Sequence, residues 1–153
     1  MTPEDLRSRA APLSNLPDEE LAYLASLASE REFPAGHVIF GEGESADRLF
    51  IIESGKVVLE LATAGPEPKV ILSLGKGDLL GVSWMFPPYQ WSFTARATDT
   101  TKAIEIDAVK VREACGMDPS LKAWVLEVVA KEAVRRLQAT RMQLLDVYGG
   151  RLR

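Results

Sequence analysis

The sequence has one cysteine and one histidine in 153 residues, and this scarcity excludes several kinds of protein chemistry. Cys115 has no second cysteine to pair with, which excludes an internal disulfide and an internal four-cysteine iron–sulfur cluster. His37 alone cannot build a metal centre that needs several histidines. The sequence also lacks a P-loop, an HExxH pair and a nucleophile elbow. We therefore predict a protein that is not an enzyme and binds no metal.

Long apolar runs and an excess of positive charge are missing too. No stretch is long enough to cross a membrane, and no basic segment followed by an apolar one marks a secretory signal. Eighteen basic and twenty-two acidic residues give a net charge of −4, which disfavours a surface devoted to nucleic acid. We predict a cytoplasmic protein that by itself uses neither a membrane nor nucleic acid as a partner.

The central third of the chain contains short apolar segments separated by turn residues. Gly36, Gly43 and Gly55 stand where such segments stop, and glycine enters a positive φ without steric cost. The pair Ser54-Gly55 predicts a hairpin. Together the segments predict a mainly β fold, an eight-stranded double-sheet jelly roll with flanking helices. The expected strands are Arg31–Phe33, His37–Phe40, Leu49–Glu53, Lys56–Ala62, Val70–Leu74, Leu79–Val82, Phe93–Thr98 and Ala103–Ile106.

Helices are expected on both sides of the roll. Leucines recur at helical spacing from Leu16 to Leu27, with Pro17 at a suitable first-turn position, and this helix should lie on the roll. After the last strand, Val109–Cys115 predicts a short helix closed by Gly116.

Asp118-Pro119 supplies an N-cap and a first residue for a long helix that runs to about Val147. The whole chain is expected to be one domain, with the first helix and the roll at 13–117 and the long helix at 118–148.

The long helix carries two apolar stripes. A helix of nearly thirty residues rises ~40 Å, which is longer than a roll of this size can cover. One stripe near its start, Leu121, Trp124, Val125 and Val128, can pack on the roll. The other has the alternating spacing of three and four that is typical of a coiled-coil seam, and it predicts a homodimer. The seam candidates are Leu126, Ala130, Ala133, Leu137, Thr140 and Leu144. The alternative is a helix packed wholly on its own roll.

Two segments, 33–43 and 49–57, together with the element order, resemble the cyclic-nucleotide-binding domain superfamily. The resemblance extends from about Leu13 to Val147. Arg135 to Thr140 is similar to a stretch of the dimerisation helix in the sensor half of catabolite-activator-type bacterial transcription regulators. In those regulators a DNA-binding domain follows the long helix, whereas this sequence ends at Arg153. The resemblance implies a sensor module, without a complete DNA-binding regulator in this chain as given.

In that family a cassette of a glycine, a glutamate, a short helical turn and an arginine holds the phosphate and the ribose. The matching segment here, Gly81 to Phe93, places Val82 at the glutamate and Trp91 at the arginine, while Gly81 and Ser92 are kept. Burying a phosphate without a paired cation costs several kcal/mol. Cyclic AMP or cyclic GMP bound in the family's usual way is therefore not expected, and the cofactor stays unknown. The pocket candidates are Gly81, Val82, Ser83, Trp84, Trp91, Ser92 and, by similarity to a base-contacting helix position, Thr140.

A replacement cation is not evident from the sequence. Arg96 lies five residues from Trp91, so strand alternation predicts that the two side chains point to opposite faces. The cassette segment is instead rich in aromatic residues: Trp84, Phe86, Tyr89, Trp91 and Phe93. These rings either line an apolar pocket for a flat or hydrophobic small molecule or fill a pocket that has no ligand.

The function predicted from these features is a non-catalytic, dimeric sensor module in signal transduction, which passes a ligand-dependent change through its long helix to a protein partner. Two alternatives stay open. One is a scaffold or interaction protein that binds no small molecule. The other is the isolated sensor half of a transcription regulator that lacks its DNA-binding domain.

Overall fold

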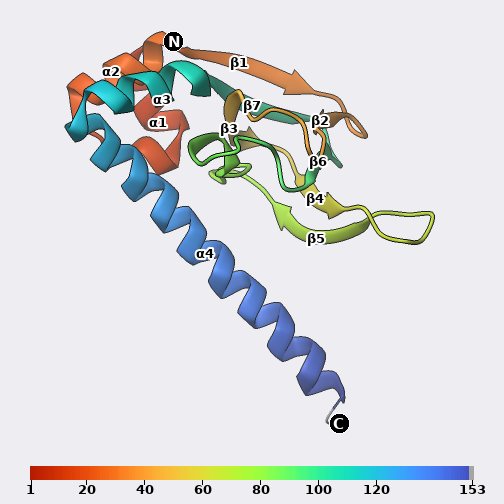
Figure 1. The fold of residues 1–153 in the computed structure, drawn as a ribbon. Coiled ribbons are helices and arrows are strands. Elements are labelled where there is room, and N and C mark those ends of the chain that lie inside the picture. The colour runs from red at the N-terminus through yellow and green to blue at the C-terminus, as the bar shows by residue number, and fades with distance from the viewer. Residues whose placement is uncertain (152–153) are drawn as a thin grey trace.

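The computed structural model describes the backbone of residues 1–151 and the side chains of residues 1–146, and it shows two antiparallel sheets flanked by helices (Figure 1). The three-stranded sheet has the order β1-β7-β3, and the four-stranded sheet has the order β2-β6-β4-β5. The strands are β1 (Ala28–Phe33), β2 (Val38–Phe40), β3 (Arg48–Ser54), β4 (Val57–Leu61), β5 (Lys69–Leu74), β6 (Thr94–Ala97) and β7 (Thr101–Asp107). The mainly β, double-sheet architecture expected from the sequence is confirmed.

Aromatic side chains join the two sheets. The Phe50 ring of β3 lies 6.2 Å from the Phe40 ring of β2 and 6.0 Å from the Phe33 ring of β1, measured between ring centroids. The other face of the three-stranded sheet packs on the helices, where Leu49 and Ile51 help to line an apolar cavity of about 20 Å³. Strand alternation explains why β3 is apolar on both faces, since it serves two layers of core.

Two sequence-based expectations about the strands are wrong. Ser54-Gly55 does not close a hairpin, because β3 and β4 belong to different sheets. Gly55 has φ 104°, and a Cβ there would lie 2.6 Å from the Cα of Thr101, so the glycine carries the chain closely past β7 from one sheet to the other. Leu79–Val82 is not an eighth strand. Only Leu79 forms a bridge, with Ile51, before the chain turns inward at Gly81.

The helices gather at one end of the roll (Figure 1). They are α1 (Pro3–Arg9), the 3₁₀ turn η1 (Ala11–Leu13), α2 (Asp18–Ser26), α3 (Ala108–Met117) and α4 (Pro119–Arg151), with a second 3₁₀ turn, η2 (Ser83–Met85), between β5 and β6. The expected leucine-rich helix is α2, in which Leu21 and Leu24 are buried. Helix α1 was not expected from the sequence, although Thr2 and Asp5 form a capping box at its start.

The junction of α3 and α4 follows the sequence in part. The Asp118 carboxylate accepts hydrogen bonds from the backbone N–H groups of Ser120 and Leu121 at 3.0 and 3.2 Å, which confirms the predicted N-cap. The prediction that Gly116 closes the short helix is wrong. Gly116 lies inside α3, which ends at Met117 with Asp118 as its C-cap in an extended conformation, so no left-handed residue closes the helix before α4 begins.

Helix α4 packs on the roll along one side and leaves the other side exposed. Val125, Val129 and Glu132 are buried against the rest of the chain. The start of the predicted inner stripe agrees, since Leu121 and Val125 are buried and Trp124 and Val128 are half-buried. Of the predicted seam, Leu126 is half-buried, and Ala130, Ala133, Leu137, Thr140 and Leu144 are exposed in this single chain. Beyond the sheets the helix extends away from the roll (Figure 1).

Candidate functional site

The site begins with a tight turn after β5. The Asp78 carboxylate accepts a hydrogen bond from the backbone N–H of Gly75 at 2.8 Å, and Gly77 adopts φ 85°. The chain then runs beside β3, where Ile52 donates to the carbonyl of Asp78 and Leu80 donates to the carbonyl of Phe50, both at 2.9 Å. These bonds fix the point at which Gly81 enters the interior of the roll.

Trp91 and Gly81 meet in the interior. Trp91 is 4% exposed, and its ring lies flat on Phe40 with centroids 3.8 Å apart and planes 8° apart. A Cβ placed on Gly81 would lie 2.8 Å from Cζ3 of Trp91 and 3.3 Å from Cζ of Phe93. A side chain at position 81 would thus collide with the indole. The absence of a side chain at Gly81 lets the indole occupy this part of the core.

The 3₁₀ turn η2 carries three of the other predicted pocket residues. Val82 is its half-buried N-cap residue, and the hydroxyls of Ser83 and Ser92 lie 3.5 Å apart. Trp84 is 2% exposed and donates from Nε1 to the carbonyl of Gly81 at 2.7 Å. The structure therefore brings Trp84 and Trp91 each against Gly81, and it places the hydroxyls of Ser83 and Ser92 side by side.

The aromatic residues of this segment do not form one pocket wall. Trp84 turns toward the helices and lines the small apolar cavity beneath them. Trp91 packs between the sheets, whereas Phe86 is 46% exposed. The two most buried rings of this cluster fill separate parts of the core. The arrangement therefore favours rings that fill the core over rings that share one ligand pocket.

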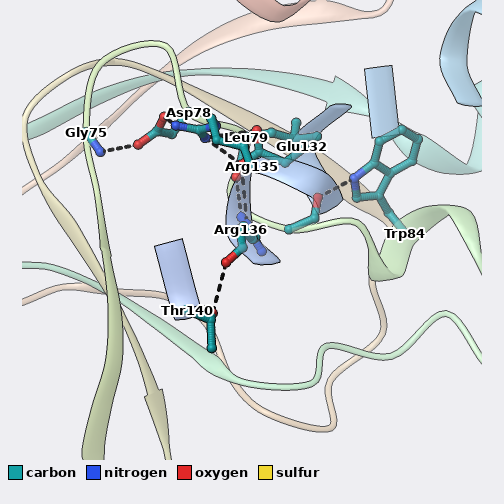
Figure 2. A network of polar contacts seen from close by, with 9 residues as sticks. Gly75, Asp78, Leu79, Trp84, Glu132, Arg135, Arg136 and Thr140 are labelled. Atoms are coloured by element: carbon teal, nitrogen blue, oxygen red, sulfur yellow. Dashed lines mark hydrogen bonds and ion pairs between the residues drawn. The ribbon is translucent and has the colours of Figure 1, made fainter. Parts of the chain in front are cut away.

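An ionic network from α4 closes over the same segment (Figure 2). The Arg135 guanidinium contacts the Asp78 carboxylate at 2.5 Å and the Glu132 carboxylate at 2.7 Å. Arg136 contacts Glu132 at 3.3 Å and donates to the carbonyl of Leu79. Its guanidinium carbon also lies 5.8 Å from the centre of the Phe93 ring. The network ties α4 to the turn that leads into Gly81.

Burial and ion pairing act in opposite directions on these two arginines. Burial lowers the pKa of Arg136 from its ordinary value, and the nearby Glu132 carboxylate only partly offsets this effect. For Arg135 burial also acts to lower the pKa, but the hydrogen bonds and charges of Glu132 and Asp78 outweigh it, so the pKa is raised. Arg136 is thus a cation beside the site, and its Nε and Nη2 are engaged by Glu132 and Leu79.

The two remaining residues weighed from the sequence lie apart from Trp91. Thr140 is exposed on α4, and its hydroxyl donates to the carbonyl of Arg136 within the same helix at 2.9 Å (Figure 2). Arg96 points away from the cassette and contacts the buried carboxylate of Glu60 at 2.8 Å. Arg96 is therefore engaged elsewhere and is not a replacement cation for the site, although the alternation argument does not apply because Trp91 lies outside β6.

The ionic network is the part of the site that sequence reasoning missed. Glu132 precedes Arg135 by three residues and Arg136 by four, a helical spacing that favours ion pairs and could have been noticed. The contact to Asp78 could not, because it joins segments more than fifty residues apart. Over the residues that the structure describes, histidine, cysteine and carboxylate side chains form no group suited to a metal ion. Within the same residues, no helix combines the length and apolarity that a membrane span requires.

The roll, the segment from Gly75 to Phe93 and the long helix beside it have the arrangement of a cyclic nucleotide-binding domain. The family model of the cyclic nucleotide-binding domain matches residues 30–118, and the chain belongs to this family.

One similar protein is a bacterial transcription regulator. The chain is 28% identical over 144 residues to a CRP-like cAMP-activated global transcriptional regulator of Mycobacterium tuberculosis, and the match covers 94% of this chain and 62% of that protein. The chain thus spans less than two thirds of that relative's length.

Two solved structures resemble the fold over most of the chain. A putative cyclic nucleotide-binding protein from Geobacter metallireducens superposes with a TM-score of 0.81 at 31% identity, covering 90% of this chain and 98% of that one. The N-terminal domain of a transcriptional regulator from Streptomyces coelicolor superposes with a TM-score of 0.66 at 27% identity, covering 92% of this chain and 94% of that one. The resemblance to sensor domains of CRP-like regulators, stated from the sequence, is confirmed.

Proposed function

We propose that this chain is a non-catalytic, dimeric sensor module in which Trp91 fills the position where the family binds the phosphate of a cyclic nucleotide. The observation that carries the proposal is the burial of Trp91, 4% exposed, flat on Phe40 and in close approach to Gly81. A cyclic phosphate has a full negative charge and needs donors. The indole face offers neither charge nor donor at this position.

The nearest arginine does not offset this loss. A ligand that took over Nε or Nη2 of Arg136 would compete with the Glu132 carboxylate and the Leu79 carbonyl, and Glu132, 6% exposed, would lose one of its two cations if Arg136 moved away. Val82 supplies no carboxylate for a ribose hydroxyl. These features support a module that does not bind cyclic AMP or cyclic GMP by the family's usual contacts.

Restoring the two missing groups tests this proposal. The double variant Val82→Glu/Trp91→Arg should bind cyclic AMP in calorimetry, because it regains the carboxylate and the guanidinium fork, while the wild type should give no binding heat. Trp91→Ala is the matched control that empties the position without adding a cation. Micromolar binding by the wild type would contradict the proposal. If the double variant is unfolded by circular dichroism, the wild-type titration still decides.

The dimer part of the proposal is supported by the exposed seam of α4. Val134, Met142 and Leu145 are more than half exposed on other faces of α4. On the seam itself, Leu137 is 61% exposed and Leu144, seven residues further on, is 54% exposed. Such a row of apolar side chains is what a coiled-coil partner covers. Sedimentation of the wild type should show a dimer, and Leu137→Glu should shift it to monomer without unfolding. Gln138→Glu, which adds the same charge off the seam, should leave the dimer intact.

A ligand-free scaffold is the second candidate, and the filled position favours it as well. The sensor and the scaffold differ in whether any small molecule binds the protein and raises its melting temperature. Thermal shift with a panel of flat and apolar compounds separates them, since a sensor should gain stability with one class of compound and a scaffold with none. The cytoplasmic location and a protein partner stay predictions.

A further inference from the structure

A second arginine, Arg112 of α3, contacts a different part of the cassette segment from Arg136. Its Nη1 donates to the carbonyl of Trp84 at 2.7 Å and to the carbonyl of Ala46 at 3.0 Å. Its guanidinium carbon lies 4.1 Å from the centre of the Tyr89 ring, and Nη2 lies 3.9 Å from the Asp47 carboxylate. The Arg112 side chain is only 17% exposed.

These contacts join two parts of the cassette to the loop before β3. Trp84 belongs to η2, Tyr89 to the turn that follows it, and Ala46 to the loop before β3. That loop is itself joined to the cassette, because Ala46 donates to the carbonyl of Tyr89 at 2.7 Å and Trp91 donates to the carbonyl of Glu44 at 2.9 Å. One side chain of α3 therefore binds both the loop before β3 and the cassette segment that is hydrogen-bonded to this loop.

The part held by Arg112 includes an energetically costly backbone. Tyr89 has φ 56°, a left-handed conformation that a non-glycine residue adopts only when its surroundings enforce it. The guanidinium stacked on the Tyr89 ring and the bond from Ala46 to its carbonyl are two such restraints. Removing the first should release the turn locally.

We infer that Arg112 is a positioning residue that couples the cassette segment Gly81–Phe93 to α3. The cassette segment and α3 must move together. A shift of η2 or of the turn at Tyr89 either breaks the hydrogen bonds of the nearly buried Arg112 guanidinium or moves α3 as well. Helix α3 passes directly into α4 at Asp118, so the coupling reaches the helix that forms the proposed dimer. The inference rests on the proposed sensor function for its purpose, but its test needs no ligand.

Hydrogen–deuterium exchange of the full, unliganded chain tests the coupling. Arg112→Lys keeps the charge but cannot donate to two carbonyls while stacking flat on Tyr89. The amides of Gly43, Ala46, Tyr89 and Trp91 should exchange about tenfold faster, because the segment loses roughly the protection that one hydrogen bond provides. The amides of β7 should keep their exchange rates.

Arg9→Lys is the matched control. Arg9 holds α1 to β3 through two bonds to Glu53, at 2.7 and 2.8 Å, and makes no contact with the cassette among the hydrogen bonds of the described residues. This variant should leave the cassette amides unchanged. Equal acceleration of cassette and β7 amides in Arg112→Lys, or none in the cassette, would overturn the inference.

A second variant acts from the other end and covers the case in which Arg112→Lys does not fold. Tyr89→Leu keeps Arg112 but removes the ring beneath it, and reciprocity requires faster exchange in α3, residues 111–117. Unchanged α3 amides would overturn the coupling. Binding of cyclic AMP by the wild type would sink the proposed function yet leave these exchange results as they are, so the two failures are distinguishable.

Discussion

Trp91 lies flat against Phe40, with 3.8 Å between ring centroids and 8° between ring planes, at the position where the family's cassette has an arginine. This stacking makes the cassette part of the core. If the indole supports the core, Trp91→Ala should lower the free energy of unfolding by about 3–5 kcal/mol, as large-to-small changes at buried aromatic residues do. Urea unfolding followed by circular dichroism measures the loss.

Phe86→Ala is the control for that change, because Phe86 belongs to the same segment but is 46% exposed. Its cost should stay below about 1 kcal/mol. Equal costs for the two variants would show that Trp91 contributes no more to the core than an exposed ring.

Gly81→Ala tests the close approach to the indole. A methyl group at this position would lie 2.8 Å from the Trp91 ring, and both belong to a packed core, so the change should cost about 1–3 kcal/mol. In a Trp91→Ala background the cost should largely disappear. The comparison is Gly116→Ala inside α3, where a Cβ would meet no atom within 4 Å. This change should raise the free energy of unfolding by up to about 1 kcal/mol, because alanine favours a helix more than glycine does.

Glu132→Gln tests the ionic network between α4 and the turn before the cassette. Glu132 is 6% exposed and faces both Arg135 and Arg136, so neutralising it leaves Arg136 without its carboxylate. Thermal or urea unfolding should show a loss of about 3 kcal/mol. Glu127→Gln, which breaks an exposed i,i+4 pair with Lys131 on the same helix, should cost about 0.5 kcal/mol or less. A small effect at Glu132 would mean that α4 docks without the network.

The pair of Arg9 and Glu53 predicts how stability depends on pH. The hydrogen bond from Arg9 lowers the pKa of Glu53 below the ordinary value of 4.5, so the folded state binds the proton less readily than the unfolded chain. The stabilisation is therefore complete above pH 4.5 and is lost as the pH falls through the lower, folded pKa. Arg9→Gln should flatten this part of the stability curve between pH 5 and pH 2, measured against wild type. An unchanged curve would contradict the role of the pair.

The fold was predictable because its signals are local. Glycines at positive φ mark the ends of apolar strands, and Asp118-Pro119 marks the start of α4. The strand expected at Leu79–Val82 was wrong because an apolar segment of four residues looks the same whether it pairs as a strand or turns inward as part of a core. The hairpin expected at Ser54-Gly55 was wrong for a related reason, since a turn signal does not say which sheet the next strand joins.

The site was predictable only in its local part. Matching Gly81 and Trp91 to the family's cassette located the two residues that the structure brings together. The contacts of the two arginines that bind this segment were not predictable. Arg136 reaches Leu79 across fifty-seven positions, and Arg112 reaches Ala46 across sixty-six, and no sequence pattern states such distances. Long-range packing decides which of eighteen basic residues lies at a site.

The most direct measurement is a calorimetric titration of the wild-type protein with cyclic AMP and with cyclic GMP. With Trp91 in the phosphate position and Val82 in place of a carboxylate, neither nucleotide should give a binding heat at protein concentrations that would detect a micromolar dissociation constant, equivalent to about −8 kcal/mol. Binding at that affinity or tighter would show that the indole yields to the ligand, and that Arg136 or backbone N–H groups supply the phosphate contacts that this site is proposed to lack.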